Sequence, residues 1–89
     1  MPQRRNIYRV RVRNKARKSL RRIPKHFRDR ILAALVRLRN DPYLGEPLLG
    51  EYKGKYSLHI HPYRVIYQID KKKLIIRVLR IDHRGAAYR

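Results

Sequence analysis

Positive charge is the feature that most limits what this chain can fold into. Its 89 residues include 25 lysines and arginines but only six aspartates and glutamates, which gives a formal net charge of +19 with histidine neutral. Most of these cations have no carboxylate to pair with, and an unpaired charge is almost never fully buried. The cations must therefore cover a small domain, and the apolar residues, 43% of the chain, supply its core.

The same charge predicts a polyanionic partner. A folded domain this basic is typical of proteins that bind phosphate backbones, with an anionic membrane surface as the second candidate. No apolar stretch reaches the roughly 18 residues of a membrane span, and no targeting segment is visible, so we expect a cytoplasmic protein. The absence of cysteine excludes a disulfide scaffold, a thiolate zinc site and a cysteine nucleophile. Without repeats or linkers, residues 1–89 are expected to form a single domain.

A strand and two helices are predicted in the first half of the chain. Apolar residues alternate with arginines over residues 8–13, which is the period of a half-buried strand. They then recur at spacings of three and four over residues 14–22, where Asn14 is the expected N-cap. The same spacing continues over residues 24–38, a helix that begins at a proline and is stopped by Asn40-Asp41-Pro42. The two helices should form a hairpin.

The second half is predicted to be a loop followed by three strands. Glycine and proline punctuate residues 43–54, and β-rich runs follow over residues 56–60, 63–69 and 74–81. Pro62 marks the first turn between them, and a polar loop marks the second. We therefore expect an α+β fold: an N-terminal strand, a helical hairpin, then a three-stranded antiparallel meander, all in one antiparallel sheet. The face away from the helices must carry arginines, histidines and tyrosines.

The available residue types favour phosphate chemistry without a metal. The six carboxylates are scattered and His59-x-His61 has no obvious third ligand, so neither a metal site nor a cofactor is expected. RNA can be cleaved by its own 2′-OH when a protein supplies a proton acceptor, cations and a proton donor. The residues suited to these roles are concentrated in the second half: Lys53, Lys55, His59, His61, Arg64, Arg80, His83, Arg84 and Tyr88.

Each candidate also has a purely structural interpretation. Lys53 and Lys55 flank a glycine in the predicted loop and could simply be solvated. The histidines could occupy a polar sheet face, and Tyr88 could anchor the chain end. Arg64 lies among apolar strand residues, so it is either paired with one of the rare carboxylates or directed at a ligand.

Four segments match a known family in order along nearly the whole chain. They are Asn40-Asp41-Pro42, Pro47-Leu48-Leu49-Gly50, Pro62-Tyr63-Arg64-Val65-Ile66-Tyr67-Gln68-Ile69, and Arg77-Val78-Leu79-Arg80-Ile81-Asp82-His83-Arg84 with Tyr88. Together they resemble the RelE/ParE toxin superfamily. The resemblance implies a RelE-like α+β toxin of a type II toxin–antitoxin system.

RelE-like members enter the ribosomal A site and cleave mRNA there without a metal, whereas ParE-like members inhibit DNA gyrase. The resemblance therefore implies a ribosome-dependent endoribonuclease that inhibits translation by 2′-OH attack. The alternatives are a gyrase inhibitor and a non-catalytic protein that binds ribosomal RNA. The implied partners are the ribosome, mRNA and a cognate acidic antitoxin in a heteromeric complex.

The resemblance also assigns site residues. Arg64 resembles the transition-state arginine of the family, Arg84 its second essential arginine and Tyr88 its C-terminal tyrosine. His83 resembles a histidine that many relatives carry and that could act as acid or base.

One part of the family pattern is missing. Well-known RelE toxins have two lysines where this chain has Ser57 and His59, so His59 could be the general base, or Lys53 and Lys55 could reach in from the loop. We predict Lys53, Lys55 and Arg80 as RNA-binding residues.

Overall fold

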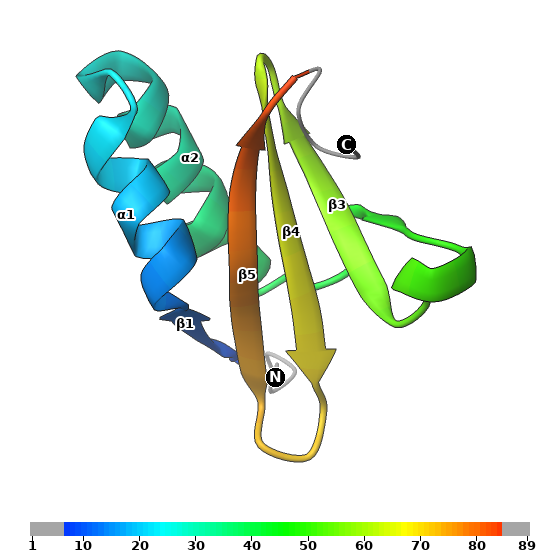
Figure 1. The fold of residues 1–89 in the computed structure, drawn as a ribbon. Coiled ribbons are helices and arrows are strands. Elements are labelled where there is room, and N and C mark those ends of the chain that lie inside the picture. Colours follow the sequence, from blue (N-terminus) through cyan, green and yellow to red (C-terminus); the bar gives the residue numbers. More distant parts are fainter. Residues whose placement is uncertain (1–6, 85–89) are drawn as a thin grey trace.

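The computed structural model describes residues 7–84, and its elements follow the predicted order with two short additions (Figure 1). The additions, β2 and the 3-10 turn η1, both fall in the segment that was expected to be a loop. The elements are β1 (Arg9–Val12), α1 (Asn14–Arg22), α2 (Lys25–Leu38), β2 (Glu46–Pro47), η1 (Gly50–Tyr52), β3 (Lys55–Ile60), β4 (Tyr63–Asp70) and β5 (Ile75–His83).

The five strands form one sheet in the order β1-β5-β4-β3-β2. The predicted antiparallel meander of β3, β4 and β5 is confirmed. The expectation of a fully antiparallel sheet is wrong for β1, which runs parallel to β5 with Val12 opposite Val78. Alternation along a single strand has the same period in both kinds of pairing, so the sequence could not show the direction of β1.

Both helices lie on the same side of the sheet (Figure 1), which we call the helix face of the sheet. The predicted break between them is confirmed, since α1 ends at Arg22 and Pro24 precedes α2. Asn14 is not the N-cap of α1: it is the first helical residue, and Arg13 takes the cap position without a side-chain hydrogen bond. Only one residue separates β1 from α1, which leaves no room for an additional cap residue.

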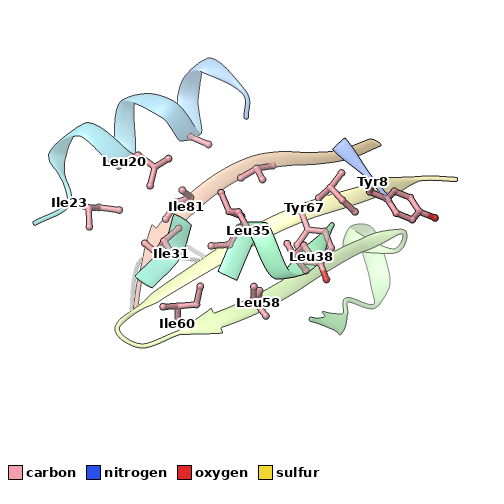
Figure 2. Close-up of a cluster of buried hydrophobic side chains, with 14 residues drawn as sticks. Tyr8, Leu20, Ile23, Ile31, Leu35, Leu38, Leu58, Ile60, Tyr67 and Ile81 are labelled. Carbon is pink, nitrogen blue, oxygen red and sulfur yellow. The ribbon is translucent and has the colours of Figure 1, made fainter. Parts of the chain in front are cut away.

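The core lies between the helices and the sheet (Figure 2). Its helical half consists of residues that recur at spacings of three and four, as predicted. The residues that meet there include Leu20 of α1 and Ile23 directly after it, Ile31, Leu35 and Leu38 of α2, and Leu58, Ile60, Tyr67 and Ile81 of the sheet. Burial of these side chains closes the helix face and leaves the opposite side of the sheet open.

Tyr67 connects this core to the segment before β2. Its ring is fully buried, and its hydroxyl donates a hydrogen bond to the Pro42 carbonyl (2.7 Å) and accepts one from the Gly45 N–H (2.9 Å). Burial raises the pKa of the Tyr67 hydroxyl above its ordinary value, because the charged form would lose its hydration. The buried hydroxyl thus ties two points of the segment before β2 to the core.

A β-bulge in β5 decides which side chains face away from the helices. Ile66 lies opposite Arg80, but the next residue, Tyr67, lies opposite Val78, so Leu79 is an extra residue in β5. In a regular strand, alternation from Val78 would turn Arg80 toward the helices. The extra residue shifts the alternation by one position, so Ile81 joins the core and its neighbours turn outward.

Candidate active site on the open face

The side of the sheet away from the helices, which we call the open face, carries a row of three polar residues. His59 on β3 lies opposite Arg64 on β4, and Arg64 lies opposite Asp82 on β5. Side chains directly opposite each other in a sheet have Cβ atoms about 4.5–5.5 Å apart. The row therefore brings an imidazole, a guanidinium and a carboxylate together on one surface.

The neighbouring row adds a second arginine. Ser57, Ile66 and Arg80 lie opposite one another across β3, β4 and β5. Arg80 Nε lies 2.8 Å from Asp82 Oδ2, and both atoms are shielded from solvent. A buried charge is tolerated when it is paired in this way, so the ion pair fixes the position of the Arg80 guanidinium on the open face.

A groove runs beside the first row, toward the edge of the sheet. It has a volume of about 330 Å³ and is lined on one side by Gly45 and Glu46 and on the other by Ser57, His59 and Arg64. Its outer wall belongs to the segment that the Tyr67 hydroxyl holds in place. An extended ligand lying in this groove would contact both His59 and Arg64.

His83 is not brought together with Arg64. It lies opposite Tyr63, and by strand alternation both residues are on the other face of the sheet from Arg64. The rings of Tyr63 and His83 meet edge to face, with centroids 5.2 Å apart. Tyr63 in turn packs edge-on against Phe27 of α2 (5.7 Å). This packing directs the His83 ring toward the helix side of the sheet, whereas the Arg64 row faces away from it.

Arg84 lies at the same end of the sheet as Arg64. Its backbone N–H donates a hydrogen bond to the Pro62 carbonyl (2.6 Å), which ties the end of β5 to the turn between β3 and β4. His61, in that turn, lies with its ring centroid 5.9 Å from that of His59. Tyr88, predicted as a site residue, lies outside the described residues.

The two candidate lysines have different locations. Lys53 is exposed and follows η1, as expected of a loop residue. Lys55 is not in a loop but opens β3, four residues before His59 and on the same side by alternation. At roughly 3.3 Å per residue it lies about 13 Å from His59 along the strand. His59 is thus the candidate general base that shares a row with Arg64.

Sequence analysis missed two residues of this surface. Asp82 was counted only among scattered carboxylates, and its role emerges from the bulge that turns it toward Arg64 and Arg80. Tyr52 lies in the segment expected to be a loop, yet the Lys55 ammonium lies 5.7 Å from its ring centroid and the Arg80 guanidinium 5.9 Å from it. The signal available for Tyr52 was an aromatic residue among lysines, a pattern typical of nucleic-acid-binding surfaces.

Within residues 7–84, no group of three or more histidine, aspartate or glutamate side chains gathers in a metal-binding arrangement. No helix in that range is long and apolar enough to cross a membrane.

Comparison with known proteins gives a consistent set of relatives. Residues 10–88 match the family model described as the ParE toxin of the type II toxin–antitoxin system parDE. The chain is 38% identical to toxin RelG of Mycobacterium tuberculosis over 88 residues, which cover 92% of this chain and 97% of RelG. It is 34% identical to toxin RelE of the same organism, over 92% of this chain and 87% of RelE.

Solved structures with the same fold include two toxin–antitoxin complexes. A chain in the RelBE2 complex of M. tuberculosis superposes with a TM-score of 0.82 and 31% identity, over 88% of this chain and 99% of that chain. A chain in the archaeal RelE–RelB complex of Pyrococcus horikoshii superposes with a TM-score of 0.75 and 27% identity, over 91% of this chain and 99% of that chain.

Proposed function

The chain belongs to the RelE/ParE family of toxins of type II toxin–antitoxin systems, and we propose that it is a ribosome-dependent endoribonuclease that cuts mRNA without a metal. The observation that carries this proposal is the cross-strand row in which Arg64 lies between His59 and Asp82, next to the ion-paired Arg80. The row offers a proton acceptor and guanidinium groups on one exposed surface. RNA cleavage through the 2′-OH requires those groups in that proximity.

In the proposed reaction the RNA supplies its own nucleophile. His59 takes the proton of the 2′-OH, the 2′-oxygen forms a bond to the adjacent phosphorus, and the bond from phosphorus to the 5′-oxygen breaks. The products are a 2′,3′-cyclic phosphate and a 5′-hydroxyl, whose proton comes from a general acid. Arg64 and Arg84 stabilise the negative charge that develops on the phosphoryl oxygens.

The resemblance and the packing of His83 support one candidate for the general acid. His83 packs against Tyr63 on the helix side, which argues against it as the donor on the open face. Tyr88, the residue that resembles the C-terminal tyrosine of the family, is therefore our candidate for the donor.

The charge of the chain supports docking on ribosomal RNA. A net charge of +19 on 89 residues favours contacts with many phosphates, and each such contact releases counterions. Affinity for the ribosome should consequently fall steeply as the salt concentration rises.

The positively charged surface would require neutralisation in the resting cell, and we propose a cognate acidic antitoxin as the partner that neutralises it. The two toxin–antitoxin complexes with this fold support such a heteromeric assembly.

One observation favours a second candidate function. The family model that matches residues 10–88 carries the name of the ParE toxin, so inhibition of DNA gyrase is the alternative. A pure binder would not require the imidazole and guanidinium groups of the Arg64 row, which is why we favour the nuclease.

The deciding experiment maps the 5′ ends of mRNA after brief expression in cells. We expect the wild type to stop growth and to produce new cuts at ribosome-occupied codons. Arg64→Ala should lower the cutting rate about 10²- to 10³-fold, the cost of losing one preorganised charge at a transition state. Arg30→Ala, at an exposed position of α2, removes the same charge far from the row and serves as the matched control.

Growth arrest without new 5′ ends would exclude the nuclease, and trapped cleaved DNA in a supercoiling assay would then identify a gyrase poison. Equal cutting rates of the Arg64→Ala and Arg30→Ala variants would show that the Arg64 row takes no part in cleavage.

A further inference from the structure

Two buried apolar residues lie on the open face and are not part of the core. Ile66 and Leu79 are only 2% and 8% exposed, yet the core cluster on the helix face does not include them. They form the floor of a recess of about 170 Å³, which we call the Tyr52 recess. Half-buried Tyr52 forms one wall, and Arg13, Lys15, Lys55 and Arg80 supply the polar rim.

The recess combines an apolar floor with a cationic rim. Four cations line it, and none of the described residues that line it is acidic. Two of these cations, Lys55 and Arg80, lie within 6 Å of the Tyr52 ring centroid. Arg80 is held there by Asp82, so its guanidinium is already in position before any ligand arrives. A ligand that fits this recess must carry negative charge next to a flat or apolar group.

The size of the recess favours one unit of a polymer. Pockets that enclose a whole small molecule measure roughly 300–1,000 Å³, which is larger than this recess. One nucleotide of a single-stranded nucleic acid matches the chemistry of the recess, since the base and ribose offer apolar faces and the phosphate offers negative charge. Aromatic side chains beside cations are the common means of holding successive bases of single-stranded nucleic acid.

The recess adjoins the proposed catalytic row. Ile66 lies two residues along β4 from Arg64, and Arg80 lies two residues along β5 from Asp82. Two residues of strand correspond to about 7 Å, a separation that neighbouring nucleotides of one RNA strand can span.

We propose that the Tyr52 recess binds the nucleotide next to the scissile phosphate, with its base or ribose against Tyr52, Ile66 and Leu79 and its phosphate near Lys55. The proposal deepens the proposed function and rests on it, because it makes Tyr52 and Lys55 positioning residues for the RNA substrate. An acidic peptide is the competing ligand, but it would use the rim without needing the aromatic wall.

The test measures binding to the full chain with a fluorescent 2′-O-methyl hexaribonucleotide, which cannot be cleaved. Tyr52→Ala should weaken binding about 5- to 150-fold, the usual effect of removing one stacked aromatic side chain. It should leave the slope of log affinity against log salt unchanged. Lys55→Ala should instead reduce that slope by about 0.7, the value for one phosphate contact on a single strand.

Matched controls separate these effects from general loss of charge or of fold. Tyr43 also has a lysine ammonium 5.7 Å from its ring, but it is exposed and does not line the recess, so Tyr43→Ala should bind as the wild type does. Lys72→Ala, in the exposed hairpin loop, controls for the loss of one charge. Tyr52→Phe keeps the ring and should retain most of the affinity, and a native circular dichroism spectrum of Tyr52→Ala excludes unfolding as the cause of its lost affinity.

Equal affinities of the Tyr52→Ala and Tyr43→Ala variants would overturn the proposal. So would a Tyr52→Ala variant that loses affinity for a glutamate-rich peptide while binding RNA normally. Because the probe cannot be cleaved, the outcome does not depend on catalysis. A wild type that makes no cuts on ribosomes would refute the nuclease, whereas loss of RNA binding in Tyr52→Ala would still support the recess.

Discussion

Replacing Tyr67 with phenylalanine removes one oxygen atom and tests how the wall of the groove is held. The ring would stay in the core, but the Pro42 carbonyl would lose its donor and the Gly45 N–H its acceptor. Each hydrogen bond contributes about 1 kcal/mol, and an orphaned buried group adds a desolvation penalty, so we expect Tyr67→Phe to lower the free energy of unfolding by about 2–3 kcal/mol. For a domain of this size that corresponds to roughly 8–24 °C in melting temperature.

Urea unfolding followed by circular dichroism measures this change. The midpoint should fall while the slope with denaturant stays constant, because the buried surface is unchanged. Tyr43→Phe, at a tyrosine that is 48% exposed, is the control and should change stability by less than about 0.5 kcal/mol. A Tyr67→Phe variant as stable as that control would refute the view that the hydroxyl holds the segment before β2.

The same substitution has a distinct pH dependence. Burial raises the pKa of Tyr67 above its ordinary value of 10.0, so the native state keeps this proton at pH values where the unfolded chain has released it. The contribution of Tyr67 is therefore fully present below about pH 10 and is lost as the pH rises above it. The stability difference between wild type and Tyr67→Phe should shrink in that alkaline range, and a difference that grew there would contradict the assigned direction.

Two other substitutions probe the same surface. In Gly45→Ala the new Cβ would lie 2.8 Å from the Tyr67 hydroxyl oxygen and 2.9 Å from the Ser57 carbonyl oxygen, so we expect a loss of about 1–3 kcal/mol in urea unfolding; an unchanged midpoint would show that the segment simply moves aside. Asp82→Asn removes the negative charge that pairs with the shielded Nε of Arg80, and it should cost about 1–2 kcal/mol in the same assay. Full stability in Asp82→Asn would mean that a neutral amide positions Arg80 equally well.

The hydrophobic period predicted most of the fold, because the helices, β3 and β4 each bury one continuous stripe of apolar residues, and β5 does so on either side of its bulge. Ile31, Leu35 and Leu38 are buried as their spacing requires. The two-residue β2 was missed, since no period can be read from two positions that gain their partners only through β3. The parallel direction of β1 was missed because direction is set by the path of the whole chain and not by the strand's own residues.

The candidate site was less predictable than the fold. The arginines of the open face follow from the chain's chemistry, but the expected strand tyrosines are not there, since Tyr56, Tyr63 and Tyr67 pack with the core on the helix face. The grouping of the polar residues depends on register. Arg64 and His59 share a row because the turn at Pro62 sets the pairing of β3 with β4. His83 had the right chemistry and adjoins Arg84 in sequence, yet its pairing with Tyr63 turns it toward the helices. No local pattern distinguishes these outcomes before the strands are paired.

The bulge at Leu79 also governs which changes in length the last strand can accept. Because Leu79 is the surplus residue, a homologous chain without it would keep Arg80 and Asp82 on the same side as Arg64. The loss of Ile81, two positions later, would instead exchange core and surface for everything that follows. Correspondence between homologous sites in this strand therefore depends on where an alignment places its gap. A gap shifted by two residues would equate a buried aliphatic side chain with a charged one on the open face.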